Sequence, residues 1–80
     1  MLVSGQDEMW NHRVVRINGS DGTYYGIHEV YYDSQGNPSS CTENPVEPFG
    51  ETFEELVQDL QSFAQALEKP ILDYDSFTTR

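Results

Sequence analysis

The sequence predicts a small, two-layer α+β domain in which one amphipathic helix covers a three- or four-stranded antiparallel sheet. Three observations predict this fold. The 80 residues admit one domain. Runs of β-forming residues separated by turn clusters fill the first half of the chain, and a single run with helical spacing follows them. Because an antiparallel meander must cover one face, we expect the helix to lie on the sheet.

Three runs rich in β-forming residues account for the predicted order β-β-β-α. They lie at 10–17, 23–32 and 39–43. Turn-forming residues separate the runs, and Pro45 and Pro48 end the last one because proline cannot donate to a central ladder. In the second run, alternation places Val30 on the more apolar face, which we expect to point at the core.

The predicted helix begins after Thr52, where Thr52 and Glu55 have the spacing of a capping box. Pro70 ends it. Its apolar residues fall on one stripe of an α-helix: Phe53, Leu56, Val57, Leu60, Phe63, Ala64 and Leu67. Residues 71–74 can form a short final strand. The parts predicted in chain order are a loose leader (1–9), a single domain (10–74) and a tail (75–80).

Net charge is the strongest functional signal. The chain has 14 Asp and Glu against 4 Lys and Arg, which gives a formal net charge of -10. A field of this sign repels nucleic acid and anionic membranes and speeds encounter with basic surfaces. We therefore expect a basic protein surface or a nucleoprotein complex as partner, without direct nucleic-acid or membrane binding. The alternative is that the acidity serves solubility alone.

A cytoplasmic location is expected from the cysteine count and from hydropathy. Cys41 is the single cysteine, so an intramolecular disulfide cannot form, and a structural Cys-rich zinc site is excluded. The first five residues lack the basic and apolar regions of a signal peptide, and no apolar run approaches the ~20 residues of a membrane span.

Catalytic and metal-binding constellations are weak in this sequence, so we expect neither an enzyme nor a cofactor or metal site. Cys41 could act as a nucleophile only beside His12 or His28, and no motif pairs them. His28 and Glu29 are adjacent, and in a strand they point to opposite faces, so they cannot easily share a metal with His12.

Acidic residues of the helix are the first candidate partner-binding group: Glu51, Glu54, Glu55, Asp59 and Glu68. The first three also gain from the positive end of the helix dipole, whereas Asp59 and Glu68 have no such local explanation. The spacing of carboxylates one turn apart is of the order of the spacing of nucleic-acid phosphates, so the helix could occupy a basic groove. The alternative is a solvated helix face.

Tyrosines of the second strand are the second candidate. Tyr24, Tyr25, Tyr31 and Tyr32 cannot all be buried in so thin a domain, and the face away from the helix should expose two of them, Tyr25 and Tyr31. A contact with a second copy, giving a homodimer, is one interpretation. Ordinary cross-strand packing of rings is the other.

A resemblance to known proteins is carried by short motifs spread over residues 10–73. They are Gly26–Asp33 (GIHEVYYD), Gly36, Thr42–Val46 (TENPV), Gly50–Glu51, Glu54–Leu56 (EEL) and Leu67–Leu72 (LEKPIL). On these residues the chain resembles a family of small bacterial and phage proteins that has no assigned activity. The order of elements and the GETFEEL helix entry are also similar to the N-terminal domain of HicB-type antitoxins, a partial RNase H-like fold.

The resemblance to HicB-type antitoxins implies an acidic binder that masks a small RNA-cleaving toxin. Those antitoxins usually carry a separate DNA-binding domain, which this sequence lacks. Phage inhibitors of bacterial defence, anti-CRISPR proteins among them, share the size and charge without a common motif. We therefore expect a non-enzymatic inhibitor that covers a basic, nucleic-acid-binding surface of another protein. The alternative is an oligomer-forming scaffold domain that acts through its Tyr-rich sheet.

Overall fold

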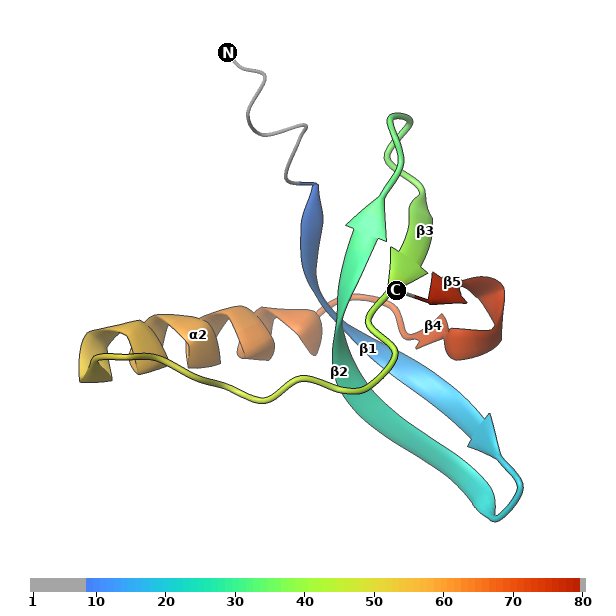
Figure 1. The fold of residues 1–80 in the computed structure, drawn as a ribbon, viewed down its shortest axis with the longest axis horizontal. Coiled ribbons are helices and arrows are strands. Elements are labelled where there is room, and N and C mark those ends of the chain that lie inside the picture. The colour runs from blue at the N-terminus through green and yellow to red at the C-terminus, as the bar shows by residue number, and fades with distance from the viewer. Residues whose placement is uncertain (1–8, 80) are drawn as a thin grey trace.

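Two long strands form the centre of the fold. The computed structural model describes residues 9–79, and within them β1 (Trp10–Gly19) and β2 (Gly22–Tyr32) pair antiparallel over their full length. The two residues between them make a tight turn, after which Gly22 takes a φ of 143° that favours glycine. Both strands were predicted from the sequence, and Figure 1 shows the long twisted hairpin that they build.

The sheet is mixed rather than antiparallel throughout. β3 (Pro38–Cys41) pairs antiparallel with β2, but β4 (Leu72–Asp73) runs parallel to β1, and β5 (Thr78–Thr79) runs parallel to β3. The strand order is β4-β1-β2-β3-β5. The antiparallel-only prediction is wrong because the chain returns from the helix to the free edge of β1 and follows that strand in the same direction.

The C-terminal segment covers one face of the sheet. Val15, Val30 and Cys41 are fully buried on that face. The residues packed around them include Leu72 of β4, Tyr74 of the short 3-10 helix η1 (Tyr74–Ser76) and Phe77. The predicted tail thus begins within η1, includes β5 and contributes Phe77 to the core. Val30 faces the core as predicted.

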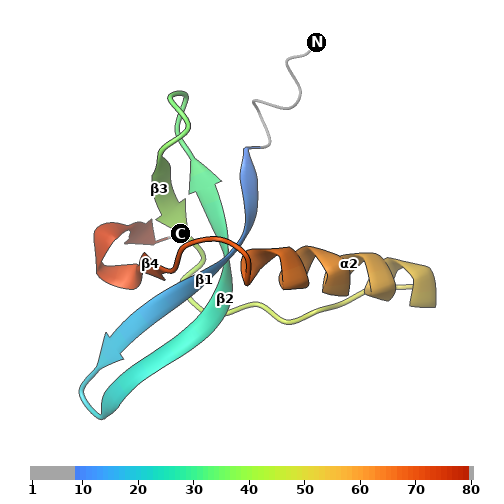
Figure 2. The ribbon, with the colours of Figure 1, turned by 180° about the vertical axis from the view of Figure 1, so that it is seen from behind.

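The helix α2 (Phe53–Ala66) packs on the opposite face of the sheet and makes its main contacts with β1. Phe63 and Ala66 are its buried residues, and the Phe63 ring lies 4.4 Å from the His12 ring of β1, centre to centre. The N-terminal half of α2 extends beyond the sheet (Figures 1 and 2). The predicted two layers are therefore matched only in part, because the sheet lies between α2 on one face and the C-terminal segment on the other.

Polar contacts fix the start of α2 and the junction that follows the helix. Thr52 is the N-cap as predicted, and its Oγ1 accepts a hydrogen bond from the Glu55 amide at 3.1 Å. After the helix, the buried guanidinium of Arg13 donates to the Pro70 carbonyl and to the Tyr32 hydroxyl, each at 2.8 Å. These bonds join β1, β2 and the segment that leads to β4.

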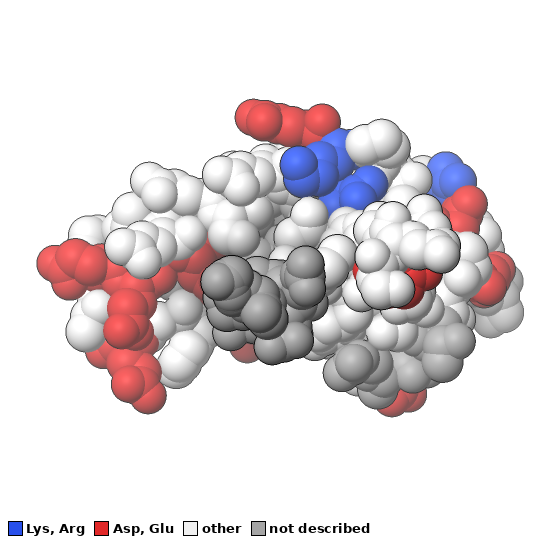
Figure 3. All heavy atoms as spheres, turned by 90° about the horizontal axis from the view of Figure 1, so that it is seen from above, with Lys and Arg blue, Asp and Glu red and all other residues white. Residues whose placement is uncertain are grey.

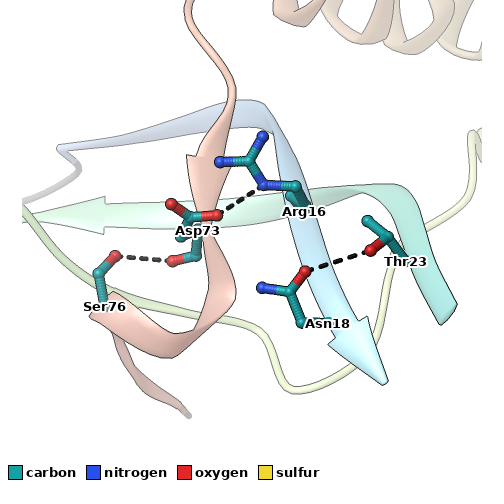
Figure 4. A network of polar contacts seen from close by, with 5 residues as sticks. All are labelled: Arg16, Asn18, Thr23, Asp73 and Ser76. Atoms are coloured by element: carbon teal, nitrogen blue, oxygen red, sulfur yellow. Dashed lines mark hydrogen bonds and ion pairs between the residues drawn. The ribbon is translucent and has the colours of Figure 1, made fainter. Parts of the chain in front are cut away.

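An ion pair fastens β4 to β1 (Figure 4). Arg16 Nε donates to Asp73 Oδ1 at 2.8 Å, and this is the one ion pair within residues 9–79. The bond from the guanidinium lowers the pKa of the Asp73 carboxyl. The Ser76 hydroxyl donates to the Asp73 carbonyl at 2.6 Å, so the same residue also holds the turn into η1.

Candidate partner-binding surface

The α2 helix carries an apolar row that the domain leaves uncovered. The row begins at Phe53, which is 75% exposed, passes through Leu60 at 48%, and ends at the C-cap residue Leu67 at 70%. Between them, Val57 is half-buried and Ala64 is exposed. The steps along this row are four, three, four and three residues, which is the spacing of the contact seam in a coiled coil. We call these five residues the α2 seam. The other two members of the predicted stripe lie outside the seam: Leu56 is half-buried, and Phe63 is buried together with Ala66, which the prediction did not include.

A polar row with two carboxylates borders the α2 seam. Glu54, Gln61 and Glu68 each follow a large seam residue by one position, so they lie on one side of the seam at intervals of about two turns. Glu51 and Glu55 add exposed carboxylates where the helix begins. Figure 3 shows Asp and Glu crowded at that end of the molecule, whereas Lys and Arg atoms on the same face lie well away from it. The seam is thus apolar along its length and strongly negative at its N-terminal end.

The five predicted acidic residues have different roles within the fold. Glu55 Oε1 accepts from the Glu51 amide at 2.9 Å, so this carboxylate caps the helix entry. Asp59 is half-buried, and its Oδ2 accepts from the Phe49 amide at 2.8 Å. Asp59 therefore has a structural role that its sequence position does not reveal. The Glu54 and Glu68 carboxylates are exposed and make no hydrogen bond or ion pair within residues 9–79.

The strand tyrosines separate by their position along β2 rather than by face. Tyr24 and Tyr25 are exposed near the hairpin tip, although they point to opposite faces. Tyr31 and Tyr32 are half-buried, and their hydroxyls donate to Glu29 and Asn11 at 2.7 Å. Of the two tyrosines chosen from the sequence, Tyr25 is exposed and Tyr31 is engaged in the sheet. Both share the face of Glu29 and His12 that carries α2, so the prediction that they lie on the face away from the helix is wrong.

The groups considered for catalysis are kept apart or buried. His28 is fully buried, and its Nδ1 is 2.9 Å from the Thr42 carbonyl. Cys41 is also fully buried, and burial raises the pKa of its thiol. His12 lies on the opposite face of the sheet from His28, where it pairs with Glu29 across the strands. Residues 9–79 contain no group of three or more His, Cys, Asp or Glu side chains placed to hold a metal ion.

Comparisons of the chain with known proteins found no match, so the fold and the exposed surface are the observations that bear on function. No family model, curated protein or solved structure matches the chain. The resemblance to HicB-type antitoxins therefore stays a prediction. In the part of the chain that the structure describes, no helix has both the length and the apolar character needed to cross a membrane.

Proposed function

We propose that the protein is a non-enzymatic binder that covers a basic surface of another protein with α2. The α2 seam is the observation that carries this proposal, because Phe53 and Leu67 would be costly to expose on a surface that contacts nothing. The seam offers apolar area, and the carboxylates beside it select a partner of opposite charge. An amphipathic basic helix, or an apolar groove with a basic rim, has the complementary chemistry.

Charge favours a different protein over a second copy of this chain. Two α2 seams packed antiparallel would bring Glu54 of one copy beside Glu68 of the other, and a parallel arrangement would bring the acidic helix entries together. Each copy also carries a formal net charge of -10. Like charges across an interface disfavour the wrong partner, whereas Lys and Arg at the same positions would form ion pairs.

Nucleic-acid-binding proteins are the class of partner that best fits this surface. Their contact sites are rich in Lys and Arg that neutralise phosphates. An acidic helix placed on such a site would exclude the nucleic acid, and a HicB-type antitoxin or a phage inhibitor of bacterial defence would act in this way. The expected activity is inhibition by masking, in a nucleoprotein complex or on the basic protein alone.

Capture of partners from host lysate across a salt series tests the proposal. The tagged wild type is compared with E51Q/E54Q/E55Q, in which the side-chain amide oxygen introduced at position 55 can still accept from the backbone amide of residue 51. The matched control D21N/E43Q/D75N removes three exposed carboxylates elsewhere. We expect a basic nucleic-acid-binding partner that moderate salt releases. The helix variant should lower its affinity by roughly tenfold and flatten the salt dependence. Equal capture by the two variants would contradict the proposal.

An oligomer-forming scaffold is the second candidate function. Exposed rings at Tyr24 and Tyr25, together with the α2 seam, give the chain apolar surface at both of its extremities. Sedimentation at several concentrations separates the two functions. A stable oligomer that salt does not weaken would favour the scaffold, whereas a monomer at all concentrations would favour the binder.

A further inference from the structure

A pocket of about 650 Å³ lies on the face of the sheet that carries α2. Trp10 and His12 line it from β1, and Glu29 lines it from β2 beside His12. The remaining lining residues come from segment 45–49 and, through Asp59, from α2. Four parts of the chain that are distant in sequence therefore contribute to one concave site.

The segment that forms one side of this pocket is fastened at both ends. The Val46 amide donates to the Ile27 carbonyl of β2 at 2.8 Å, and the Phe49 amide donates to Asp59 Oδ2 of α2 at 2.8 Å. Trp10 is also oriented, because its ring stands edge-on to the His12 ring at 5.4 Å between centres. Fixed walls mean that the pocket is present before any ligand arrives, as in most small-molecule sites.

Three carboxylates from three different elements line the pocket, and no Lys or Arg does. Glu29 uses Oε1 to accept from the Tyr31 hydroxyl, and Asp59 uses Oδ2 for the Phe49 amide. Their second oxygens, and both oxygens of Glu47, make no hydrogen bond within the described chain. The pocket therefore keeps several strong acceptors for a ligand that brings positive charge.

His12 adds a hydrogen-bonding nitrogen to the pocket. The side chain is 94% buried, since 6% of it is exposed, and Nδ1 lies 2.7 Å from the Ser62 hydroxyl. Its Nε2 has no hydrogen-bond partner among residues 9–79, although the residue lines the pocket. Nε2 is open to solvent from the pocket, because the fully buried side-chain atoms without a partner in the described chain are Arg13 Nε and His28 Nε2. If Nδ1 donates to Ser62, then Nε2 is an acceptor for a ligand N–H.

We propose that this pocket binds a guanidinium group. Trp10 and Phe49 supply aromatic rings, 43% and 70% exposed, on which a planar cation can stack. The five N–H donors of a guanidinium lie in one plane and can reach acceptors on several sides, whereas an ammonium is a compact point charge. A bare metal ion is the poorer fit, because the described acidic and histidine side chains do not converge at coordination distance.

The guanidinium has two sources that share this chemistry, an arginine side chain of a protein and a free guanidino compound. The assignment to an arginine of a partner rests on the proposed function, because the basic surface of that partner would present the arginine. The affinity of the pocket itself does not depend on that function. The pocket carboxylates Glu29 and Glu47 lie outside the α2 seam and its acidic border, so variants of the two surfaces can be tested separately.

Fluorescence of Trp10, the single tryptophan of the chain, reports the pocket directly. The full-length protein is titrated with a capped Gly-Arg-Gly peptide, with agmatine, and with the matching Gly-Lys-Gly peptide. We expect saturable changes with a dissociation constant on the order of 1 mM for a guanidinium probe of this size. The variant E29Q/E47Q should weaken binding by about tenfold, and the surface control E43Q should leave it unchanged.

Each outcome decides the inference. Saturation by the Arg peptide assigns the site to protein arginine, and saturation by agmatine alone assigns it to a free guanidino compound. Equal binding of the Lys peptide, or no saturable change with either guanidinium probe, overturns the proposal. The single variants E47Q and E29Q are measured as well, because Glu47 is exposed and its substitution cannot disturb folding. Full guanidinium binding by both single variants would also overturn the proposal. Partner capture by E29Q/E47Q then shows separately whether the masking function persists.

Discussion

At the scale of single residues, burial determines what Cys41 can do. Its thiol is fully buried in the core cluster with Val15 and Val30, and burial raises its pKa. The reactive thiolate is therefore suppressed further than in an exposed cysteine. This residue serves packing rather than chemistry.

We predict that native Cys41 is inert towards a disulfide-exchange reagent at neutral pH and reacts fully once urea unfolds the chain. The measurement is thiol titration in the two states. A fast reaction in the native state would mean that β3 and the C-terminal segment do not cover this position.

The ion pair of Arg16 and Asp73 makes a pH prediction. The hydrogen bond from Arg16 lowers the pKa of Asp73 below its ordinary value of 3.8. The pair therefore stabilises the fold fully above pH 3.8, and this contribution is lost as the pH falls through the lower folded pKa. In the variant R16Q, the pKa of Asp73, followed by NMR of its side-chain carboxyl, should rise towards 3.8. An unchanged pKa would show that the pair does not form in solution.

At the scale of elements, α2 is held by one narrow edge. Phe63 is 8% exposed and packs on His12, whereas Leu60 on the neighbouring side of the helix is 48% exposed. The two residues belong to the same predicted stripe, yet only Phe63 is removed from water by the fold.

Alanine substitutions should separate these two positions. F63A removes a buried ring and should lower the free energy of unfolding by about 3 kcal/mol. L60A removes a half-exposed side chain and should cost about 1 kcal/mol or less. Urea unfolding of both variants gives the comparison. Equal losses would indicate that the α2 seam is covered in the free protein.

Local sequence signals predicted the strands and the helix well. Alternation and turn residues located β1, β2 and the start of β3, and the pairing of Thr52 with Glu55 located the N-cap of α2. Such signals act over a few residues, so they are visible in the sequence itself. The parallel pairings of β4 and β5 join strands about 38 to 57 positions apart, and two-residue strands carry no periodicity of their own.

The candidate site was predicted only in part for a related reason. Helical spacing shows which residues share a stripe, but not whether another element covers it, so the exposure of Phe53 and Leu67 could not be foreseen. Likewise, the bond from the Phe49 amide gives Asp59 a structural role that depends on a loop ten residues away. The pocket around Trp10 needs four separate segments, and no short motif announces it.

At the scale of the whole molecule, the fold separates a core from a contact surface. The sheet and the C-terminal segment bury Val15, Val30 and Cys41, and α2 extends from this unit with its seam and its acidic entry exposed. The carboxylates gathered at the helix entry, in a chain of net charge -10, would orient the molecule as it approaches a basic partner. We therefore propose that α2 is the surface that contacts the partner.

Hydrogen exchange of the captured complex, compared with the free protein, tests that claim most directly. Amides of an exposed helix that becomes covered should exchange more slowly in the complex. We expect new protection across residues 53–67 and unchanged exchange at the hairpin tip around Tyr24 and Tyr25. Protection confined to the hairpin tip, with α2 exchanging as in the free protein, would contradict it and place the contact on the tyrosines of β2.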